Sequence, residues 1–149
     1  MSIFVTSDYQ FGRTLAAANR GFASVEEMND NLIDIWNSKI TKNDTVYHLG
    51  NFAWDSVACE YATAYLNGKI MFIRGKYDFP LTTNSLVLTK RHEIIPDLTY
   101  LEAEAAVLSY WPLENWPGKV DESLHLYGGE TLEHQISGRF NVNCEKRSY

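Results

Sequence analysis

Three short apolar runs of this 149-residue chain are each followed by a polar side chain that could bind a ligand. Asp8 follows the first run, Asn51 the second and Asp78 the third. If the runs are parallel strands of one sheet, their carboxyl ends meet at one edge, which is where open α/β sheets bind ligands. The sequence therefore predicts one composite site, in which carboxylate and amide side chains from distant segments lie together.

Basic residues near the same strand ends permit two interpretations. Arg13, Arg74 and Lys76 could form an anion pocket for a phosphate or a nucleotide. They could instead form an internal ion-pair cluster with Asp8 and Asp78, because a buried carboxylate without a partner is costly. The ion-pair interpretation is favoured, and the anion pocket stays open as the alternative.

The elements that would position these residues alternate between strands and helices in the first half of the chain. The three apolar runs are predicted strands: 3–6, 45–49 and 69–74. Ser24 and Glu27 form a capping box, so a helix should begin there and end at about residue 40. A second helix is predicted for 56–66, because Asn67 and Gly68 are typical of a helix C-terminus.

The second half of the chain is predicted to contain mostly short strands. The candidate strands are 86–88, 92–95, 98–101, 105–108, 124–127 and 140–144. Strands that alternate with helices, followed by a series of strands, favour a single α/β domain spanning 1–149. We expect two packed mixed β-sheets flanked by helices, in an α-β-β-α sandwich.

Composition and charge narrow the class of partner. Nineteen acidic and thirteen basic residues give a net charge of −6, which disfavours nonspecific binding to nucleic acid. Cys59 and Cys144 lack metal-binding spacing, and two free thiols in a chain with no visible targeting segment fit a reducing cytoplasm. No apolar run approaches the ~20 residues of a membrane helix, so membrane binding is not expected.

The histidines are interpreted as structural residues rather than metal ligands. His48 and His125 lie inside predicted strands, where a histidine with satisfied hydrogen bonds is the ordinary case. His92 and His134 have no partner at ligand spacing and are interpreted as surface residues.

Six segments carry short motifs in a fixed order. They are Thr6–Arg13 (TSDYQFGR), Val46–Ala53 (VYHLGNFA), Leu66–Asp78 (ending RGKYD), Leu108–Leu113 (LSYWPL), His125–Thr131 (HLYGGET) and Arg139–Val142 (RFNV). With these motifs the chain resembles the calcineurin-like metallophosphoesterases, in particular the small bacterial and phage type, over nearly its whole length. The resemblance implies two packed mixed β-sheets with helices outside.

The resemblance also implies two divalent metals and hydrolysis of phosphate esters, but the ligand positions are changed. Of the implied metal-binding positions, only Asp8 is intact. The others carry Gln10, Asn51, Lys76, Tyr110, Gly129 and Thr131. Tyr77 replaces the implied catalytic histidine, and Lys76 and Arg13 add positive charge that repels a divalent cation. We therefore expect no catalytic residue, no bound metal and no cofactor.

Two kinds of residue could have taken the place of the metals. We expect Lys76 or Arg13 to pair with Asp8, where a metal would have stood. Five aromatic residues fall on or beside the rim of this former site: Trp54, Tyr77, Tyr110, Trp111 and Tyr127. They could fill the emptied cavity, or they could bind a partner, because Tyr and Trp dominate interface hot spots.

These departures favour a catalytically inactive protein that acts by binding another protein. A phage-type inhibitor or regulator of a host protein would fit, in the host cytoplasm if the chain is phage-encoded. The identity of the partner and the formation of homo-oligomers stay open. One alternative is a module that binds a nucleotide or phosphate without turnover. Another is a residual metal-dependent phosphodiesterase, with metals held by Asp8, Gln10, Asn51, Asp78 and Glu130.

Overall fold

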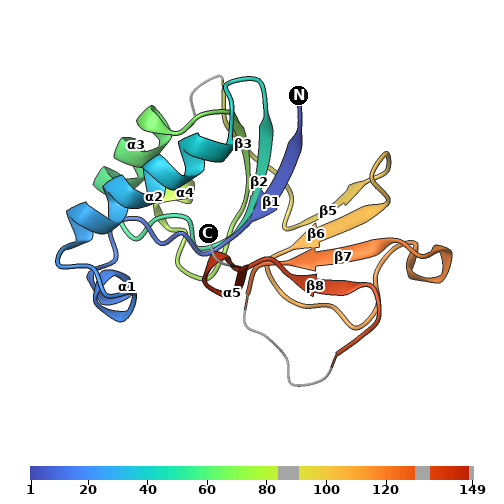
Figure 1. Cartoon of the computed structure of the whole chain (residues 1–149). Coiled ribbons are helices and arrows are strands. Elements are labelled where there is room, and N and C mark those ends of the chain that lie inside the picture. Colours follow the sequence, from blue (N-terminus) through green and yellow to red (C-terminus); the bar gives the residue numbers. More distant parts are fainter. Residues whose placement is uncertain (84–90, 130–134, 148–149) are drawn as a thin grey trace.

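The computed structural model describes residues 1–83, 91–129 and 135–147 of the chain. Two four-stranded β-sheets lie beside each other, and the longer helices cover the outer side of the first sheet (Figure 1). The expected α/β class, with two packed sheets and flanking helices, is confirmed. The predicted strand 86–88 lies outside the described residues.

The first sheet is parallel throughout its described strands, so the expectation that both sheets are mixed was wrong for this one. They are β1 (Ile3–Thr6), β2 (Thr45–Leu49), β3 (Lys69–Ile73) and β4 (Glu93–Ile94), in that order. Parallel neighbours need a long crossover connection, and helices occupy the connections that lead to β2 and β3. The polar residues that follow β1, β2 and β3 are therefore brought to the same edge of the sheet.

The connections of the first sheet contain α1 (Thr14–Asn19), α2 (Val25–Lys39), α3 (Ser56–Tyr65) and α4 (Pro80–Thr83). The predicted capping box begins α2, where the Glu27 amide donates to Ser24 Oγ at 3.1 Å and the Ala23 amide donates to Glu27 Oε2 at 2.8 Å. Asp55 caps α3 by accepting the Ala58 amide at 2.8 Å. None of the described helices is long and apolar enough to span a membrane.

The second sheet contains β5 (Leu98–Leu101), β6 (Ala106–Ser109), β7 (Leu124–Tyr127) and β8 (Arg139–Asn141), in that order. β5 pairs with β6 antiparallel, whereas β6, β7 and β8 pair in parallel, so this sheet is mixed. A 3-10 turn, η1 (Lys119–Asp121), precedes β7, and a short helix, α5 (Cys144–Arg147), follows β8. The carboxyl ends of β6 and β7 thus point the same way.

The last strand is shorter than the predicted 140–144, because two asparagine side chains bend the chain after β8. Asn141 Oδ1 accepts the Asn143 amide at 2.8 Å, and Asn143 Oδ1 accepts the Glu145 amide at 2.9 Å. Such local bonds compete with a strand ladder and favour the start of a helix. Cys144 therefore begins α5 instead of ending the strand.

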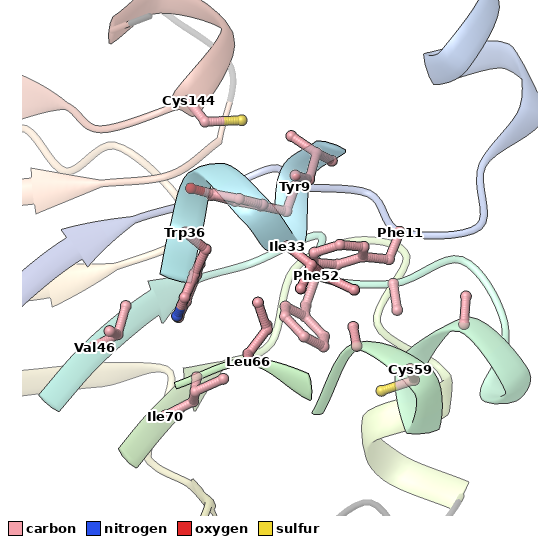
Figure 2. Packing of buried hydrophobic residues seen from close by; sticks show 14 of the residues in the cluster. Tyr9, Phe11, Ile33, Trp36, Val46, Phe52, Cys59, Leu66, Ile70 and Cys144 are labelled. Carbon is pink, nitrogen blue, oxygen red and sulfur yellow. The ribbon is translucent and has the colours of Figure 1, made fainter. Parts of the chain in front are cut away.

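One apolar cluster lies between the first sheet and its helices, and a second joins the two sheets. In the first, Trp36 of α2 packs with Val46 of β2 and Ile70 of β3 (Figure 2). In the second, Leu49 of β2 packs with Leu108 of β6. Burial of each such side chain stabilises the fold by about 1.5–3 kcal/mol, so these clusters fix the positions of the strand ends.

His48 of β2 is buried against the first cluster, as expected, but the expectation that its hydrogen bonds are satisfied was wrong. Neither ring nitrogen has a hydrogen-bond partner among the described residues. The His48 ring instead packs edge-on against Tyr9 and Phe52, at centroid distances of 5.8 and 5.0 Å. Burial lowers the pKa of His48 to about 3, so the ring is neutral near pH 7.

Two other histidines are structural residues in the described chain. His125 is buried and satisfied as expected, with its Nε2 accepting the Leu113 amide at 3.0 Å. His92 is buried rather than on the surface, because its Nδ1 accepts the Ile70 amide at 3.1 Å beside β3. His134 lies outside the described residues.

Candidate functional site

The carboxyl ends of strands from both sheets meet at one place. The Asp8 amide donates to the Gly50 carbonyl at 2.9 Å, which joins the ends of β1 and β2. The Ser7 hydroxyl donates to the Gly128 carbonyl at 3.1 Å, which joins β1 to the end of β7 in the other sheet. These contacts form the composite site expected from the sequence. We call four of its side chains the strand-end centre: Asp8, Asn51, Asp78 and Tyr110.

Two glycines allow the strand ends to approach this closely. A Cβ atom at Gly50 would overlap Tyr110 Cδ2 and would lie 2.9 Å from Gly75 Cα, and Gly50 also has a φ of 106°. A Cβ atom at Gly128 would overlap the Leu49 carbonyl oxygen. Any larger residue at these two positions would push the strand ends apart.

A hydrogen-bond network closes the strand-end centre. Asn51 Nδ2 donates to Asp8 Oδ1 at 3.0 Å and to the Tyr110 hydroxyl at 2.9 Å. Asn51 Oδ1 accepts the Tyr77 amide at 3.1 Å. The second carboxylate oxygen of Asp8 accepts from Ser7 Oγ at 2.7 Å. Asp8, Asn51 and Tyr110 are all buried, so these side chains satisfy one another without an added ligand.

Asp78 is buried beside this network and binds backbone amides. Its carboxylate accepts the amides of Asn51 at 2.7 Å, Phe52 at 2.8 Å and Gly75 at 2.6 Å. Because Gly75 follows β3 and the other two amides follow β2, Asp78 ties two strand-end loops together. The side chain therefore has a structural task and is not free for a ligand.

Burial changes the protonation of both carboxyl groups. It raises the pKa of Asp8 to about 6, and the hydrogen bonds from Asn51 and Ser7 oppose this shift only in part. Burial also raises the pKa of Asp78, although the amides of Gly75 and Phe52 oppose the shift. A neighbouring cation would lower these pKa values, but the groups that bond to the two carboxyls are uncharged, so burial remains the largest influence on both.

The backbone is left-handed at three residues of the site that are not glycine. The φ angles are 62° at Asp8, 55° at Gln10 and 55° at Asn51. Such backbone costs about 1 kcal/mol or more for each residue and is concentrated at functional sites. The three residues are also metal-ligand positions in the resemblance. Left-handed backbone is thus concentrated at the strand-end centre, where Asp8 and Asn51 bond to each other.

Arg13 does not pair with Asp8, so this part of the expected ion-pair cluster was wrong. The Arg13 guanidinium donates to Gln10 Oε1, and its Cζ atom lies 4.8 Å from the centroid of the Trp54 ring. The Gln10 side chain is therefore bonded to Arg13. A guanidinium on an aromatic ring at the surface keeps much of its hydration, whereas a buried ion pair would lose it.

Lys76 and Arg74 are also exposed and do not contact Asp8 or Asp78. Lys76 Nζ lies 5.3 Å from the centroid of the Tyr77 ring. Arg74 Nη2 lies 4.0 Å from Asp97 Oδ1, which is a surface ion pair of little energetic weight. The carboxylates of the centre are thus stabilised by uncharged donors instead of by cations.

The residues at the centre do not fit the two divalent metals that the resemblance implies. A two-metal site needs a dense set of free oxygen and nitrogen donors. Asn51 directs its NH₂ group toward Asp8 and Tyr110, and an N–H group cannot bind a cation. In the part of the chain that the structure describes, no three His, Cys, Asp or Glu residues are grouped as metal ligands.

The remaining positions of the implied metal site add no ligand in the described chain. Gly129 has no side chain, and its amide donates to the Tyr110 carbonyl at 2.6 Å. Glu130 and Thr131 lie outside the described residues.

The predicted aromatic rim is partly exposed and partly buried. Trp54 and Trp111 are exposed, and Tyr77 is half-buried against Trp54 with their ring centroids 5.1 Å apart. Tyr110 and Tyr127 are buried, so their assignment to a partner-binding rim was wrong. Tyr110 turns inward because its hydroxyl completes the hydrogen bonds of the centre, whereas the next residue, Trp111, turns outward.

Phe79 is an exposed aromatic residue that the sequence analysis did not single out. It lines a surface hollow of about 270 Å³ together with Lys76, Trp111 and Asp97. Its position in the sequence could have indicated a place at the rim, because Phe79 directly follows Asp78, which comes after the third predicted strand. Because the hollow has both a cation and a carboxylate, it is not a simple anion pocket. We call five residues around the centre the exposed rim: Arg13, Trp54, Tyr77, Phe79 and Trp111.

Comparisons with known proteins support the fold. No family model matches the chain. The uncharacterized protein MJ1445 of Methanocaldococcus jannaschii is 38% identical over 81 residues, which are 51% of this chain and 46% of that protein. The match thus covers just under half the length of this relative.

A protein of unknown function from Aquifex aeolicus, AQ665, has a similar crystal structure. The TM-score is 0.68 at 14% sequence identity, and the match covers 99% of this chain and 93% of that one. At this identity the likeness shows a shared fold. The chain therefore has the fold of AQ665, and the arguments for its function come from its own strand-end centre and exposed rim.

Proposed function

We propose that this protein acts by binding another protein through the exposed rim, without catalysis. The observation that carries the proposal is a contrast between neighbouring residues. The side chains of the strand-end centre are buried and bonded to one another, while Trp54 and Trp111 are exposed beside them. Trp54 and Trp111 lie at the surface, and Trp54 contacts the half-buried Arg13 and Tyr77; Trp, Tyr and Arg are the residue types that dominate interface hot spots.

Contacts within the rim support this role, because they hold its side chains in place before a partner arrives. Arg13 Cζ lies 4.8 Å from the Trp54 ring centroid and 5.4 Å from that of Tyr77. A side chain that is already ordered loses less conformational entropy on binding. Such binding would suit an inhibitor or regulator of its partner, in a host cytoplasm if the chain is phage-encoded.

A comparison of variants can test this role. The wild-type protein, a Trp54→Ser/Trp111→Ser variant and a Tyr100→Ser/Phe140→Ser control would each be used as bait in extract of the source cells. Tyr100 and Phe140 are exposed aromatics of the second sheet, so the control removes comparable apolar surface. Proteins retained by the wild type and the control, and lost by the rim variant, would be purified and titrated against all three.

We expect a purified partner whose Kd rises at least about tenfold for the rim variant, since interface tryptophans contribute a large share of binding energy. The control should bind within about twofold of the wild type. The proposal fails if no protein is retained by the wild type and the control and lost by the rim variant. It also fails if the purified protein hydrolyses a phosphodiester in the presence of Mn²⁺ faster than a blank preparation does.

A nucleotide-binding role has one observation in its favour. Lys76 and Trp111 line the same 270 Å³ hollow, where a base could stack and a phosphate could meet the ammonium. Asp97 and Asp78 line it too and would repel the phosphate. A thermal-shift titration with ATP decides, because a bound ligand raises the Tm with its concentration. An unchanged Tm removes this alternative.

A further inference from the structure

A second surface carries an apolar stripe on the outer side of α3. Val57, Tyr61 and Tyr65 are four residues apart and are 78%, 42% and 60% exposed. Side chains at this spacing lie on one face of a helix, so the three form a continuous stripe. The opposite side of α3 is buried in the core through Cys59 and Ala62. The outer face of a surface helix is ordinarily polar, so the stripe needs an explanation.

A groove follows part of this stripe and is lined by residues of α3 and α2. These two helices lie side by side (Figure 1). The volume of the groove is about 510 Å³, and its apolar lining includes Val25 of α2 and Val57 and Ala58 of α3. Gly12 closes one end, where its amide donates to Asn29 Oδ1 at 3.0 Å. The groove therefore has a mostly apolar lining that runs on to the exposed tyrosines.

The walls of the groove are acidic. Glu26, Asp30 and Asp55 line it, and no described residue of the lining is basic. The Tyr61 hydroxyl donates to Asp30 Oδ1 at 2.8 Å, so one carboxylate is held at the edge of the stripe. Lysine or arginine side chains of a bound molecule would be attracted here, whereas an acidic surface or a nucleic acid would be repelled.

We propose that this α2–α3 groove binds a basic amphipathic helix of another protein. Both walls are helices whose backbone groups are bonded internally, so they offer no edge to which an extended strand could pair. A helix can instead cover the stripe with its apolar face and place Lys or Arg beside the three carboxylates. Val57 to Tyr65 spans about 12 Å along α3, which matches about two turns of a bound helix.

The proposal does not rest on the exposed rim, which lies over the strand-end centre and is formed by other residues. A partner could use either surface alone. The two surfaces also differ in chemistry, since the rim carries Arg13 whereas the groove is lined by Glu26, Asp30 and Asp55. Each surface can therefore be tested by variants that leave the other unchanged.

The test uses a fluorescent synthetic peptide of about 18 residues, which is long enough to form a helix in water. It carries Leu on one face and Lys and Arg on the flanks. Binding to the full chain is followed by anisotropy, and the surface is mapped by amide NMR shifts. A second peptide has Glu in place of every Lys and Arg.

We expect the basic peptide to bind and to shift amides of α2 and α3. Its Kd should rise about tenfold for Glu26→Gln/Asp30→Asn, since two exposed charges together contribute on the order of one factor of ten. Val57→Ser/Tyr65→Ser should weaken binding at least as much. The matched controls Glu104→Gln/Asp121→Asn and Val120→Ser change exposed residues elsewhere and should leave Kd unchanged.

Any of the following results would overturn the proposal. The first is equal affinity of the basic peptide for the groove variants and the controls. The second is shifts that map to the exposed rim, or equal binding of the acidic peptide. The third is a dimer in sedimentation that Val57→Ser/Tyr65→Ser dissociates, which would assign the stripe to a second copy of the chain. Far-UV circular dichroism confirms that each variant is folded.

Discussion

The strand-end centre and the exposed rim are neighbours with opposite properties. In the centre, Asp8, Asn51 and Tyr110 are buried and bond to one another. In the rim, Trp54 and Trp111 are exposed to solvent. A ligand site ordinarily leaves polar groups unpaired for its ligand, whereas here the polar groups are paired and the exposed side chains beside them are tryptophans. The comparison indicates that the polar side chains of the centre are already paired with one another, whereas the tryptophans beside them are open to solvent.

The strand-end centre depends most on Gly50, because this glycine allows the end of β2 to lie close to Tyr110 and Gly75. We expect Gly50→Ala to lower the free energy of unfolding by about 3 kcal/mol, because an added Cβ overlaps Tyr110 and the φ of 106° strains any other residue. The matched control is Gly21→Ala, where φ is 80° but no atom lies within 4 Å. Urea denaturation of both variants gives the difference. Equal losses would show that close approach at Gly50 is unimportant.

Asp8→Asn should stabilise the protein at pH 7. The folded pKa of Asp8 is about 6 against an ordinary 3.8, so the folded state binds the proton more tightly. Stability from this group is complete below pH 3.8 and is lost as the pH rises through about 6. An asparagine stays neutral, so we expect a gain of roughly 2–3 kcal/mol at pH 7.

Urea denaturation at several pH values checks this expectation. The Asp8→Asn variant should lack the decline in stability between about pH 4 and pH 6 that the carboxyl group causes. Asp121→Asn changes an exposed aspartate and serves as the control. A loss of stability in Asp8→Asn at pH 7 would mean that the centre needs a charged carboxylate, as a metal site does.

His48→Leu should stabilise the protein by about 1–2 kcal/mol at pH 7, because it removes two buried nitrogens without hydrogen-bond partners. The effect should grow in acid. The folded pKa is about 3 against an ordinary 6.5, so wild-type stability from His48 is complete above pH 6.5 and is lost as the pH falls toward 3. Thermal unfolding at pH 7 and pH 5 checks both points. A destabilised variant would indicate that the ring has a partner in solution.

The smallest effects on stability are expected at the rim. Trp54→Ser and Trp111→Ser should each lower the free energy of unfolding by about 0.5–1 kcal/mol, because both side chains are exposed although each contacts a neighbouring ring. The same substitutions should weaken binding of a rim-dependent partner, and together they should raise its Kd at least about tenfold. A large loss of stability would instead show that the tryptophans are part of the core.

Much of the fold could be predicted because local signals agree with it. The bounds of β2 match the predicted 45–49, and the capping box at Ser24 begins α2 as expected. The carboxyl ends of β1, β2 and β3 lie together because these strands pair in parallel, as the sequence predicted. These features depend on hydrophobic periodicity and on local backbone hydrogen bonds. Both are determined by residues that lie close together in the sequence.

The partners of the site residues could not be predicted in the same way. Whether Asp8 bonds to Lys76 or to Asn51 depends on the desolvation of each donor, which is set by distant segments. The burial of Tyr110 beside an exposed Trp111 depends on one turn after β6. The motif positions showed which residues would meet, whereas the tertiary structure decided how they pair.

A titration with Mn²⁺ tests the closed centre most directly. Free Mn²⁺ gives a six-line electron paramagnetic resonance signal, which weakens when the ion binds to protein. We expect the signal to stay at full strength when a molar excess of the purified protein is added. A loss that corresponds to about two ions for each chain, and that Asp8→Asn abolishes, would show that the centre opens to hold a metal pair.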